Sequence, residues 1–179
     1  MDKSQAKRAD VTIKPAGAED AKLLSALGIV TFYEAYFEQD TAEDMARYLA
    51  ETFSVQAMEA ELSDPDATFF IALKSGSAVG YAKLLKNTRA DGLTGKNAIE
   101  LKRIYLVERV WGTGIGRQLL EHCIDTARAS GADTIWLGVW EENERGLRFY
   151  RKHGFERVGT ITFPYGDTVG INQVMERRL

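Results

Sequence analysis

The chain has 179 residues, which suits one domain with a single large core, and its 45% hydrophobic and 27% charged residues are typical of a globular protein in water. Its formal net charge of -3 provides no basic field for nucleic acid, and no apolar run is long enough to predict a membrane span or a signal peptide. One cysteine excludes an internal disulfide and two histidines offer little for a zinc site, so we expect no metal and a reducing cytoplasm.

The first half of the chain is predicted to be mainly helical. Residues 1–10 are polar and mixed in charge, which indicates a loose tail before a single domain at 11–179. A short strand at 11–14 precedes a helix whose apolar residues recur at helical spacing as far as an aromatic cluster at 31–37. We expect two more helices, one at 42–51 and one that starts after the cap Ser54 and ends near Pro65.

The chain from residue 68 onward is predicted to contain most of the strands. These are expected at 68–73 and 78–85, joined by the hairpin signal Lys74-Ser-Gly-Ser, and at 98–107, 134–140, 156–163 and 171–177. Amphipathic helices are predicted at 115–130 and 143–153, ended by Gly131 and Gly154. Cys123 falls on the apolar face of the first of them, which favours a packed thiol over a nucleophile. The pattern predicts one mixed α/β domain.

A glycine-rich turn separates the strand at 98–107 from the following helix. Gly112, Gly114 and Gly116 have no Cβ to hold an anion away from the backbone, and the helix offers unpaired N–H groups at the positive end of its dipole. These features predict a cradle for a phosphate or pyrophosphate. The spacing differs from the dinucleotide fingerprint, and no Gly-Lys-Ser/Thr of a Walker loop occurs. The alternative is a turn that only lets the helix pack close to the strand.

Three motifs, in order, carry a resemblance to a known family. They are Ile104-Tyr-Leu with Trp111-Gly-Thr-Gly-Ile-Gly-Arg, then Trp136-Leu-Gly-Val-Trp, then Asn143-Glu-Arg-Gly-Leu-Arg-Phe-Tyr-Arg-Lys-His-Gly-Phe. They resemble the acetyl-coenzyme A signature, the fifth strand and the Asn-x-x-Ala-x-x-Phe-Tyr-x-x-x-Gly-Phe segment of the GCN5-related N-acetyltransferase (GNAT) family. Trp111 replaces the usual Gln or Arg, and Gly146 the usual Ala. The first of these positions is expected to contribute mainly a backbone group.

The resemblance implies a fold and a co-substrate. The fold would be α/β (α+β), with one mixed, mostly antiparallel central sheet of about seven strands flanked by helices, the fourth and fifth splayed to admit acetyl-coenzyme A (acetyl-CoA). The backbone from Gly112 to Arg117 would hold the diphosphate, with Arg117 adding charge, and the strand edge would pair with the pantetheine arm. Asn143 would cap its helix, bind the arm, or do both. The implied cofactor-binding residues are Ile104, Tyr105, Leu106, Gly112, Thr113, Gly114, Ile115, Gly116, Arg117 and Asn143.

The resemblance also implies N-acetyl transfer to a primary amine by direct attack. Tyr150 would protonate the thiolate that leaves, and a backbone N–H near Leu106 would polarise the carbonyl. Without the resemblance, Tyr150 would be an ordinary core tyrosine. Glu100 is the candidate base, and its alternative is a strand residue that faces outward and pairs with Lys102 or Arg103.

The acceptor is expected to lie against the first helices. Tyr33 and Glu34 are the candidate substrate-binding residues, since aromatic faces and carboxylates suit an alkylammonium or polyamine. Glu34 is also a second candidate base, and solvent is a third route for the proton. The alternative for these residues is a solvated acidic edge of an amphipathic helix. Leu101-Lys-Arg-Ile-Tyr and Leu137-Gly-Val-Trp-Glu-x-Asn-Glu-Arg resemble the bacterial PaiA-type polyamine N-acetyltransferases.

Other functions and partners stay open at this point. The acceptor could instead be a protein N-terminus, a lysine or an antibiotic amine, and the protein could be an acyl-CoA sensor without catalysis. A nucleotide-phosphate binder is disfavoured because no lysine or carboxylate is placed to hold magnesium. Phe163 and Tyr165 near the last hairpin suggest a homodimer or, equally, local packing.

Overall fold

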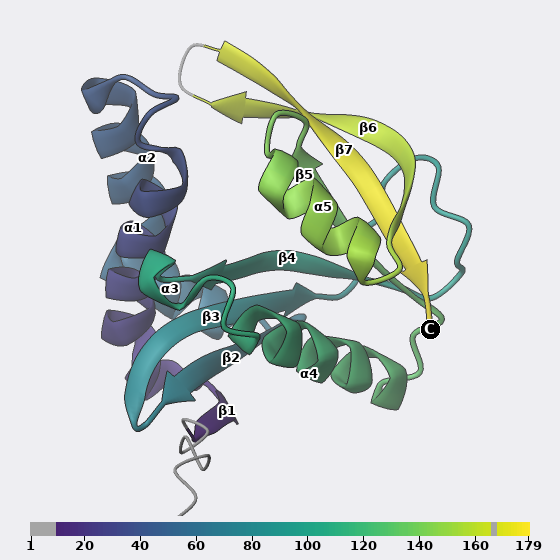
Figure 1. The fold of residues 1–179 in the computed structure, drawn as a ribbon, viewed down its shortest axis with the longest axis horizontal. Helices are drawn as coiled ribbons and strands as arrows, with labels where there is room; N and C mark the ends of the chain where they lie inside the picture. Colours follow the sequence, from purple (N-terminus) through teal and green to yellow (C-terminus); the bar gives the residue numbers. More distant parts are fainter. Residues whose placement is uncertain (1–9, 166–167) are drawn as a thin grey trace, which may run out of the picture.

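The computed structural model describes residues 10–165 and 168–179, which form a seven-stranded sheet with helices on both faces (Figure 1). Apart from Asp10, the predicted tail lies outside the described residues. The strand order is β1-β2-β3-β4-β5-β7-β6. The strands are β1 (Val11–Pro15), β2 (Ala67–Lys74), β3 (Ser77–Leu85), β4 (Ala98–Leu106), β5 (Thr134–Trp140), β6 (Glu156–Tyr165) and β7 (Thr168–Arg178).

The helices divide between the two faces of the sheet. They are α1 (Ala21–Tyr36), α2 (Ala42–Phe53), α3 (Val55–Leu62), α4 (Ile115–Ala129) and α5 (Glu144–Lys152), with two 3-10 turns, η1 (Ala18–Asp20) and η2 (Glu108–Val110). One core packs beneath α1 to α3, and a second core packs beneath α4 and α5. Cys123 is fully buried in the second core, where burial raises the pKa of its thiol to about 12. The predicted packed thiol is confirmed.

The helix and hairpin boundaries follow local sequence signals. The Ser54 hydroxyl accepts a hydrogen bond from the Ala57 N–H at 3.2 Å and so caps α3 as predicted. Between β2 and β3, Ser75 and Gly76 have φ values of 50° and 83°. Two positive φ values are required by a tight hairpin turn, which explains the Ser-Gly pair. The last two strands extend further toward one another than predicted, and the turn at 166–167 lies outside the described residues.

The central feature of the sheet is the separation of β4 from β5. The two strands pair in parallel only from Ala98, opposite Thr134, to Glu100, opposite Trp136. Beyond this point β4 stays paired with β3, and β5 stays paired with β7. Lys102 is an extra residue in the β4 register, and such a bulge bends a strand. The sheet therefore opens into a V, which confirms the predicted fold and its splayed strands.

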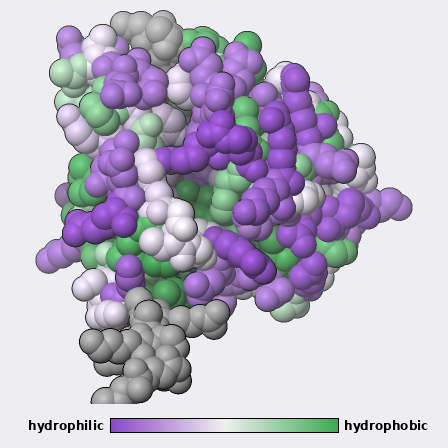
Figure 2. All heavy atoms as spheres, viewed as in Figure 1, coloured by the Kyte–Doolittle hydropathy of each residue, from purple (hydrophilic) through white to green (hydrophobic). Residues whose placement is uncertain are grey.

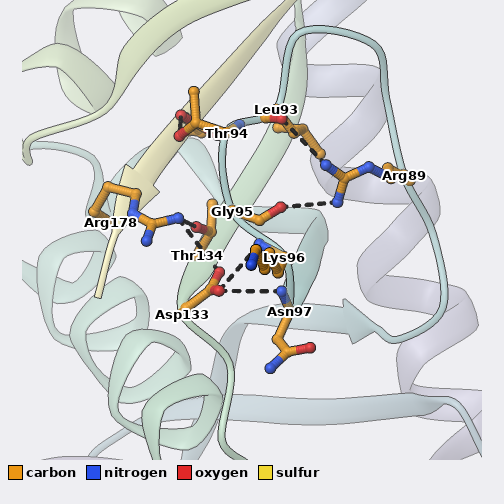
Figure 3. A network of polar contacts seen from close by, with 10 residues as sticks. Arg89, Leu93, Thr94, Gly95, Lys96, Asn97, Asp133, Thr134 and Arg178 are labelled. Atoms are coloured by element: carbon orange, nitrogen blue, oxygen red, sulfur yellow. Dashed lines mark hydrogen bonds and ion pairs between the residues drawn. The ribbon is translucent and has the colours of Figure 1, made fainter.

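The polar loop between β3 and β4 secures the closed end of the V (Figure 3). The Asp133 carboxylate, just before β5, accepts hydrogen bonds from the N–H groups of Lys96 and Asn97 at 3.0 and 3.2 Å. Within the loop, the Arg89 guanidinium donates to the carbonyl oxygen of Gly95 at 2.8 Å. These bonds fix the start of β4 beside the start of β5, so the two strands diverge from a defined point.

Candidate functional site

A cleft of about 1380 Å³ runs through the open part of the V. The ends of β4 and β5 line it, together with α1, the start of α4 and α5. Figure 2 shows this face as largely hydrophilic, with hydrophobic residues in a recess between the two halves. A cleft of this kind, mostly apolar inside with polar groups at its rim, is typical of a binding site for a small molecule.

The predicted anion cradle forms one mouth of the cleft. Gly112 and Gly114 have φ values of 74° and 88°, and no atom of the protein lies within 4 Å of the Cβ that either position lacks. Within the described part of the chain, no acceptor pairs with the backbone N–H groups of Gly112, Gly114, Ile115, Gly116 and Arg117. Unpaired donors at the positive end of α4 provide the chemistry that a diphosphate requires. The residues present therefore fit the diphosphate of coenzyme A.

Replacing Gly114 by valine should weaken coenzyme A binding about 5-fold to 30-fold, because left-handed backbone costs an L-residue about 1–2 kcal/mol and 1.4 kcal/mol is a factor of ten. The strain would be relieved by moving the turn, which would turn the cradle amides away. Isothermal titration measures the effect. Gly131→Val is the matched control, since Gly131 has a φ of 84° and equally open surroundings at the other end of α4. Equal losses of affinity in both variants would contradict the cradle.

The free edge of β4 continues from the cradle into the cleft. The Val107 N–H donates to the Val79 carbonyl oxygen at 2.9 Å, so residues at odd positions near this end bond to β3. In an antiparallel pair the alternate residues turn their N–H and C=O groups to the other side, which here is the gap. Ile104 and Leu106 therefore present backbone groups to the cleft, as the resemblance implied, while the Tyr105 side chain packs toward α1.

Trp111 does more than the sequence predicted for the first signature position. Its indole Nε1–H donates to the Leu106 carbonyl oxygen at 2.8 Å, so the side chain ties the glycine turn to the free edge of β4. The other lone pair of that carbonyl and the Leu106 N–H still face the cleft. The expectation of a mainly backbone contribution at this position was incomplete, because it ignored a ring long enough to reach the strand.

Tyr150 lines the cleft from α5, and its ring is half-buried against Phe155 at 5.6 Å between centroids. Its hydroxyl forms no hydrogen bond with the described residues. Burial raises the pKa of the phenol, and the nearby Tyr36 and Cys123 side chains add to the shift. The phenol is therefore protonated at neutral pH, which is the state that a general acid needs.

Asn143 connects the two sides of the cleft. Its Oδ1 accepts from the Gly146 N–H at 2.9 Å, which caps α5, and its Nδ2 donates to the Tyr36 hydroxyl at 3.4 Å. A Cβ at Gly146 would lie 2.9 Å from that Nδ2, so glycine leaves room for the folded-back amide. The capping role of Asn143 is confirmed, and its role toward the pantetheine arm stays a prediction.

Asn143→Asp should separate these two roles. The carboxylate retains the cap, so we expect a wild-type melting temperature, whereas Asn143→Ala should lose about 1 kcal/mol of stability. A carboxylate cannot donate a hydrogen bond to an amide carbonyl of the arm, so Asn143→Asp should bind acetyl-CoA more weakly than the wild type. Thermal melting and titration measure both quantities. Wild-type affinity in Asn143→Asp would show that the side chain only caps.

Glu100 lies at the closed end of the cleft, where β4 leaves β5. Its side chain is buried rather than facing outward, and Lys102 Nζ lies 3.1 Å from its Oε1. The pairing with Lys102 is therefore present, while Arg103 pairs elsewhere. Its carboxylate is paired with Lys102, and no contact with a described residue directs it into the gap, so the role of Glu100 as a base stays a prediction.

The helix α1 turns a different face to the cleft from the one that the sequence predicted. Tyr33 is 51% exposed and stacks on Phe37, and the Glu34 carboxylate accepts from the Glu108 N–H at 2.7 Å. Neither residue lines the cleft, so their substrate-binding role is an untested prediction that this geometry does not favour. The aromatic wall is instead made by Phe32, Tyr36, Tyr48, Tyr105, Trp140 and Phe163.

A buried ion cluster, missed from the sequence, supports this aromatic wall. The Glu61 carboxylate from α3 bonds Arg103 through both oxygens, at 2.6 and 2.9 Å, and Lys83 at 2.8 Å. Arg103 lies in the cleft wall with its guanidinium 5.2 Å from the Phe53 ring. The cluster joins α3 to β3 and β4, so it holds the first helices against the sheet. Three separate elements contribute to it, and no sequence spacing indicates such a contact.

The comparisons with known proteins agree with this geometry. A model of the acetyltransferase (GNAT) family matches residues 29–155. The chain belongs to the GNAT family. It is 34% identical over 160 residues to an uncharacterized N-acetyltransferase of Mycobacterium tuberculosis, covering 89% of this chain and 98% of that one. It is 30% identical over 157 residues to an uncharacterized N-acetyltransferase of Lactobacillus delbrueckii subsp. lactis, covering 88% and 91%.

A solved structure shows the same fold. The PaiA N-acetyltransferase of Thermoplasma acidophilum, in complex with coenzyme A, superposes with a TM-score of 0.77 at 23% identity, covering 95% of this chain and 99% of that one. As a GNAT protein, the chain is an acyltransferase with acetyl-CoA as its co-substrate. Among residues 10–165 and 168–179, no helix has the length and apolar character to cross a membrane, and no cluster of His, Cys, Asp or Glu could hold a metal ion.

Proposed function

We propose that this GNAT protein transfers the acetyl group of acetyl-CoA to a primary amine that attacks the thioester directly. The observation that carries the proposal is the row of unpaired donors, from the cradle amides to the edge of β4, in a cleft that an unpaired, protonated Tyr150 also lines. The amides would hold the diphosphate, Ile104 and Leu106 the arm, and the Leu106 N–H the carbonyl oxygen. Tyr150 would donate its proton to the departing sulfur.

We infer that the acceptor is a cationic alkylamine of the polyamine class. Asp40, Glu141 and Glu142 line the cleft and form no ion pair with another described residue. They follow the C-terminal ends of α1 and β5, where Tyr36 and Trp140 lie. The rings of Tyr36 and Trp140 are 6.2 Å apart and can bind ammonium groups through their faces. The positive charges of Arg103 and Lys102 are offset by Glu61 and Glu100, so they do not repel such an amine strongly.

Release of free thiol from acetyl-CoA tests both parts of this proposal. With spermidine as acceptor, we expect turnover well above the rate in buffer. Butylamine offers one ammonium group instead of three, so its kcat/KM should be lower by about tenfold or more, which corresponds to ~1.4 kcal/mol from a second ammonium contact. Peptide N-termini, lysine and an aminoglycoside complete the panel. A higher kcat/KM for any of these than for spermidine would contradict the polyamine class.

The homodimer and the reducing cytoplasm also stay predictions. The ring centroids of Phe163 and Tyr48 are 6.3 Å apart, so Phe163 packs within its own chain. The Tyr165 side chain lies outside the described residues. The local-packing alternative therefore accounts for Phe163. Light scattering on the eluting protein measures the mass in solution, and a monomeric mass would contradict the dimer.

A further inference from the structure

Trp111 and Arg145 meet across the cleft from its two halves. Trp111 belongs to the turn between η2 and α4, and Arg145 belongs to the first turn of α5. The guanidinium carbon of Arg145 lies 3.2 Å from the centroid of the Trp111 ring, which is a close cation–π contact. The ring is itself fixed by its bond to the Leu106 carbonyl oxygen. The arginine is therefore held at the residue that immediately precedes the first cradle glycine.

The charge of Arg145 is not neutralised by an ion pair. Arg145 forms no hydrogen bond or ion pair with the described residues, although Glu108 is near enough to interact electrostatically. Burial lowers the pKa of its guanidinium, which nevertheless stays charged at any physiological pH. Three other cations that line the cleft are paired with carboxylates: Lys102 with Glu100, Arg103 with Glu61 and Arg117 with Glu121. Lys152 and Arg177 also line the cleft and have no carboxylate partner among the described residues, so Arg145 differs from them by its contact with Trp111, next to the cradle.

We propose that Arg145, held in place by Trp111, is the cation that binds the diphosphate of coenzyme A beside the cradle amides. A planar guanidinium can donate two parallel hydrogen bonds to phosphate oxygens and also supplies a positive charge. The neutral cradle amides supply hydrogen bonds but no net charge. Arg117, to which the sequence assigned this charge, is exposed and bonded to Glu121 at 2.7 Å. Trp111 thus replaces the usual polar residue of the signature with a platform for an arginine from α5. The inference rests on acetyl-CoA as co-substrate and is independent of the acceptor.

Arg145→Gln tests the assignment with three ligands that differ in their phosphates. We expect about 10-fold to 100-fold weaker binding of coenzyme A, the range for a lost hydrogen bond to a charged group, and the same loss for dephospho-coenzyme A, which keeps the diphosphate. S-acetylpantetheine has no phosphate, so its affinity should not change. Arg148→Gln is the matched control on the same helix, because Arg148 is exposed and paired with Glu144 at 3.2 Å.

Substitution of the platform provides an independent measurement. Trp111→Leu removes both the ring and the bond to Leu106, so it should weaken coenzyme A binding nearly as much as Arg145→Gln. The double variant should lose little more than either single variant, because both act through one contact. Trp111→Phe retains a ring and should lose less than Trp111→Leu. Melting temperatures identify any variant that fails to fold.

Three results would overturn the assignment. Wild-type affinity of Arg145→Gln for coenzyme A would remove the role altogether. An equal loss for S-acetylpantetheine would place Arg145 on the arm, and a loss confined to coenzyme A would place it on the 3′-phosphate. Failure of the proposed function would be seen differently, as an absence of thiol release by the wild-type protein with every amine tested.

Discussion

Tyr150→Phe should lower kcat by about 100-fold to 10,000-fold, the usual contribution of a positioned general acid, while coenzyme A binds as tightly as to the wild type. The ring stays in place against Phe155, so only the proton donor is lost. Steady-state thiol release at saturating acetyl-CoA measures kcat, and titration measures affinity.

Tyr81→Phe is the matched control for this substitution. Tyr81 is fully buried in the core beneath α1 to α3, its hydroxyl has no partner among the described residues, and it does not line the cleft. Removal of the Tyr81 hydroxyl should leave kcat unchanged. A Tyr150→Phe variant with wild-type kcat would remove the acid role. An acyl-CoA sensor without catalysis would instead bind coenzyme A and show no thiol release in either the wild type or the variant.

Glu61→Ala should destabilise the protein by about 3 kcal/mol, because it leaves two cations without their shared carboxylate. The side chains of Lys83 and Arg103 are only 7% and 12% exposed, so water cannot replace the missing partner fully. Urea denaturation measures the free energy of unfolding. Glu59→Ala is the control, since Glu59 is an exposed glutamate of the same helix without an ion pair among the described residues. Equal losses of unfolding free energy in both variants would contradict a stabilising role of the Glu61 ion cluster.

The difference in the free energy of unfolding between the wild type and Glu61→Ala should change with pH in one direction only. Burial alone would raise the pKa of the Glu61 carboxyl, but the hydrogen bonds and charges of Arg103 and Lys83 lower it overall, from an ordinary value of 4.5. A carboxyl with a lowered folded pKa stabilises the protein fully above its unfolded pKa and loses this stabilisation as the pH falls through the folded value. The difference in the free energy of unfolding should therefore be constant near neutral pH and should shrink as the pH falls below 4.5. A difference that grows on acidification would contradict it.

Much of the fold could be predicted because its signals are local. Ser54 caps the third helix, and the strand at Thr134–Trp140 has the predicted limits, since each depends on a cap or an apolar run within a few residues. The cradle was predictable for the same reason. Its glycines must adopt left-handed backbone or lie open to a ligand, and that requirement is visible in the spacing of Gly112 and Gly114.

The parts of the site that were missed depend on contacts between distant segments. The aromatic cluster of the first helix contains both Tyr33 and Tyr36, and only the rotation of α1 against the sheet decides that Tyr36 reaches the cleft. Arg145 and Trp111 meet because α5 and the glycine turn face one another across the V. Helical phase could have favoured Tyr36, as Phe32 one turn earlier is apolar and buried, whereas nothing in the sequence pairs Trp111 with Arg145.

A titration of ¹⁵N-labelled protein with coenzyme A, followed through the backbone amide resonances, would show whether the cradle amides bind the diphosphate. We expect the amide resonances of Gly112, Gly114 and Gly116 to shift strongly on binding and the amide protons to exchange more slowly with solvent, because these groups gain phosphate oxygens as acceptors. Binding that leaves these three resonances and their exchange rates unchanged would contradict this role of the cradle amides.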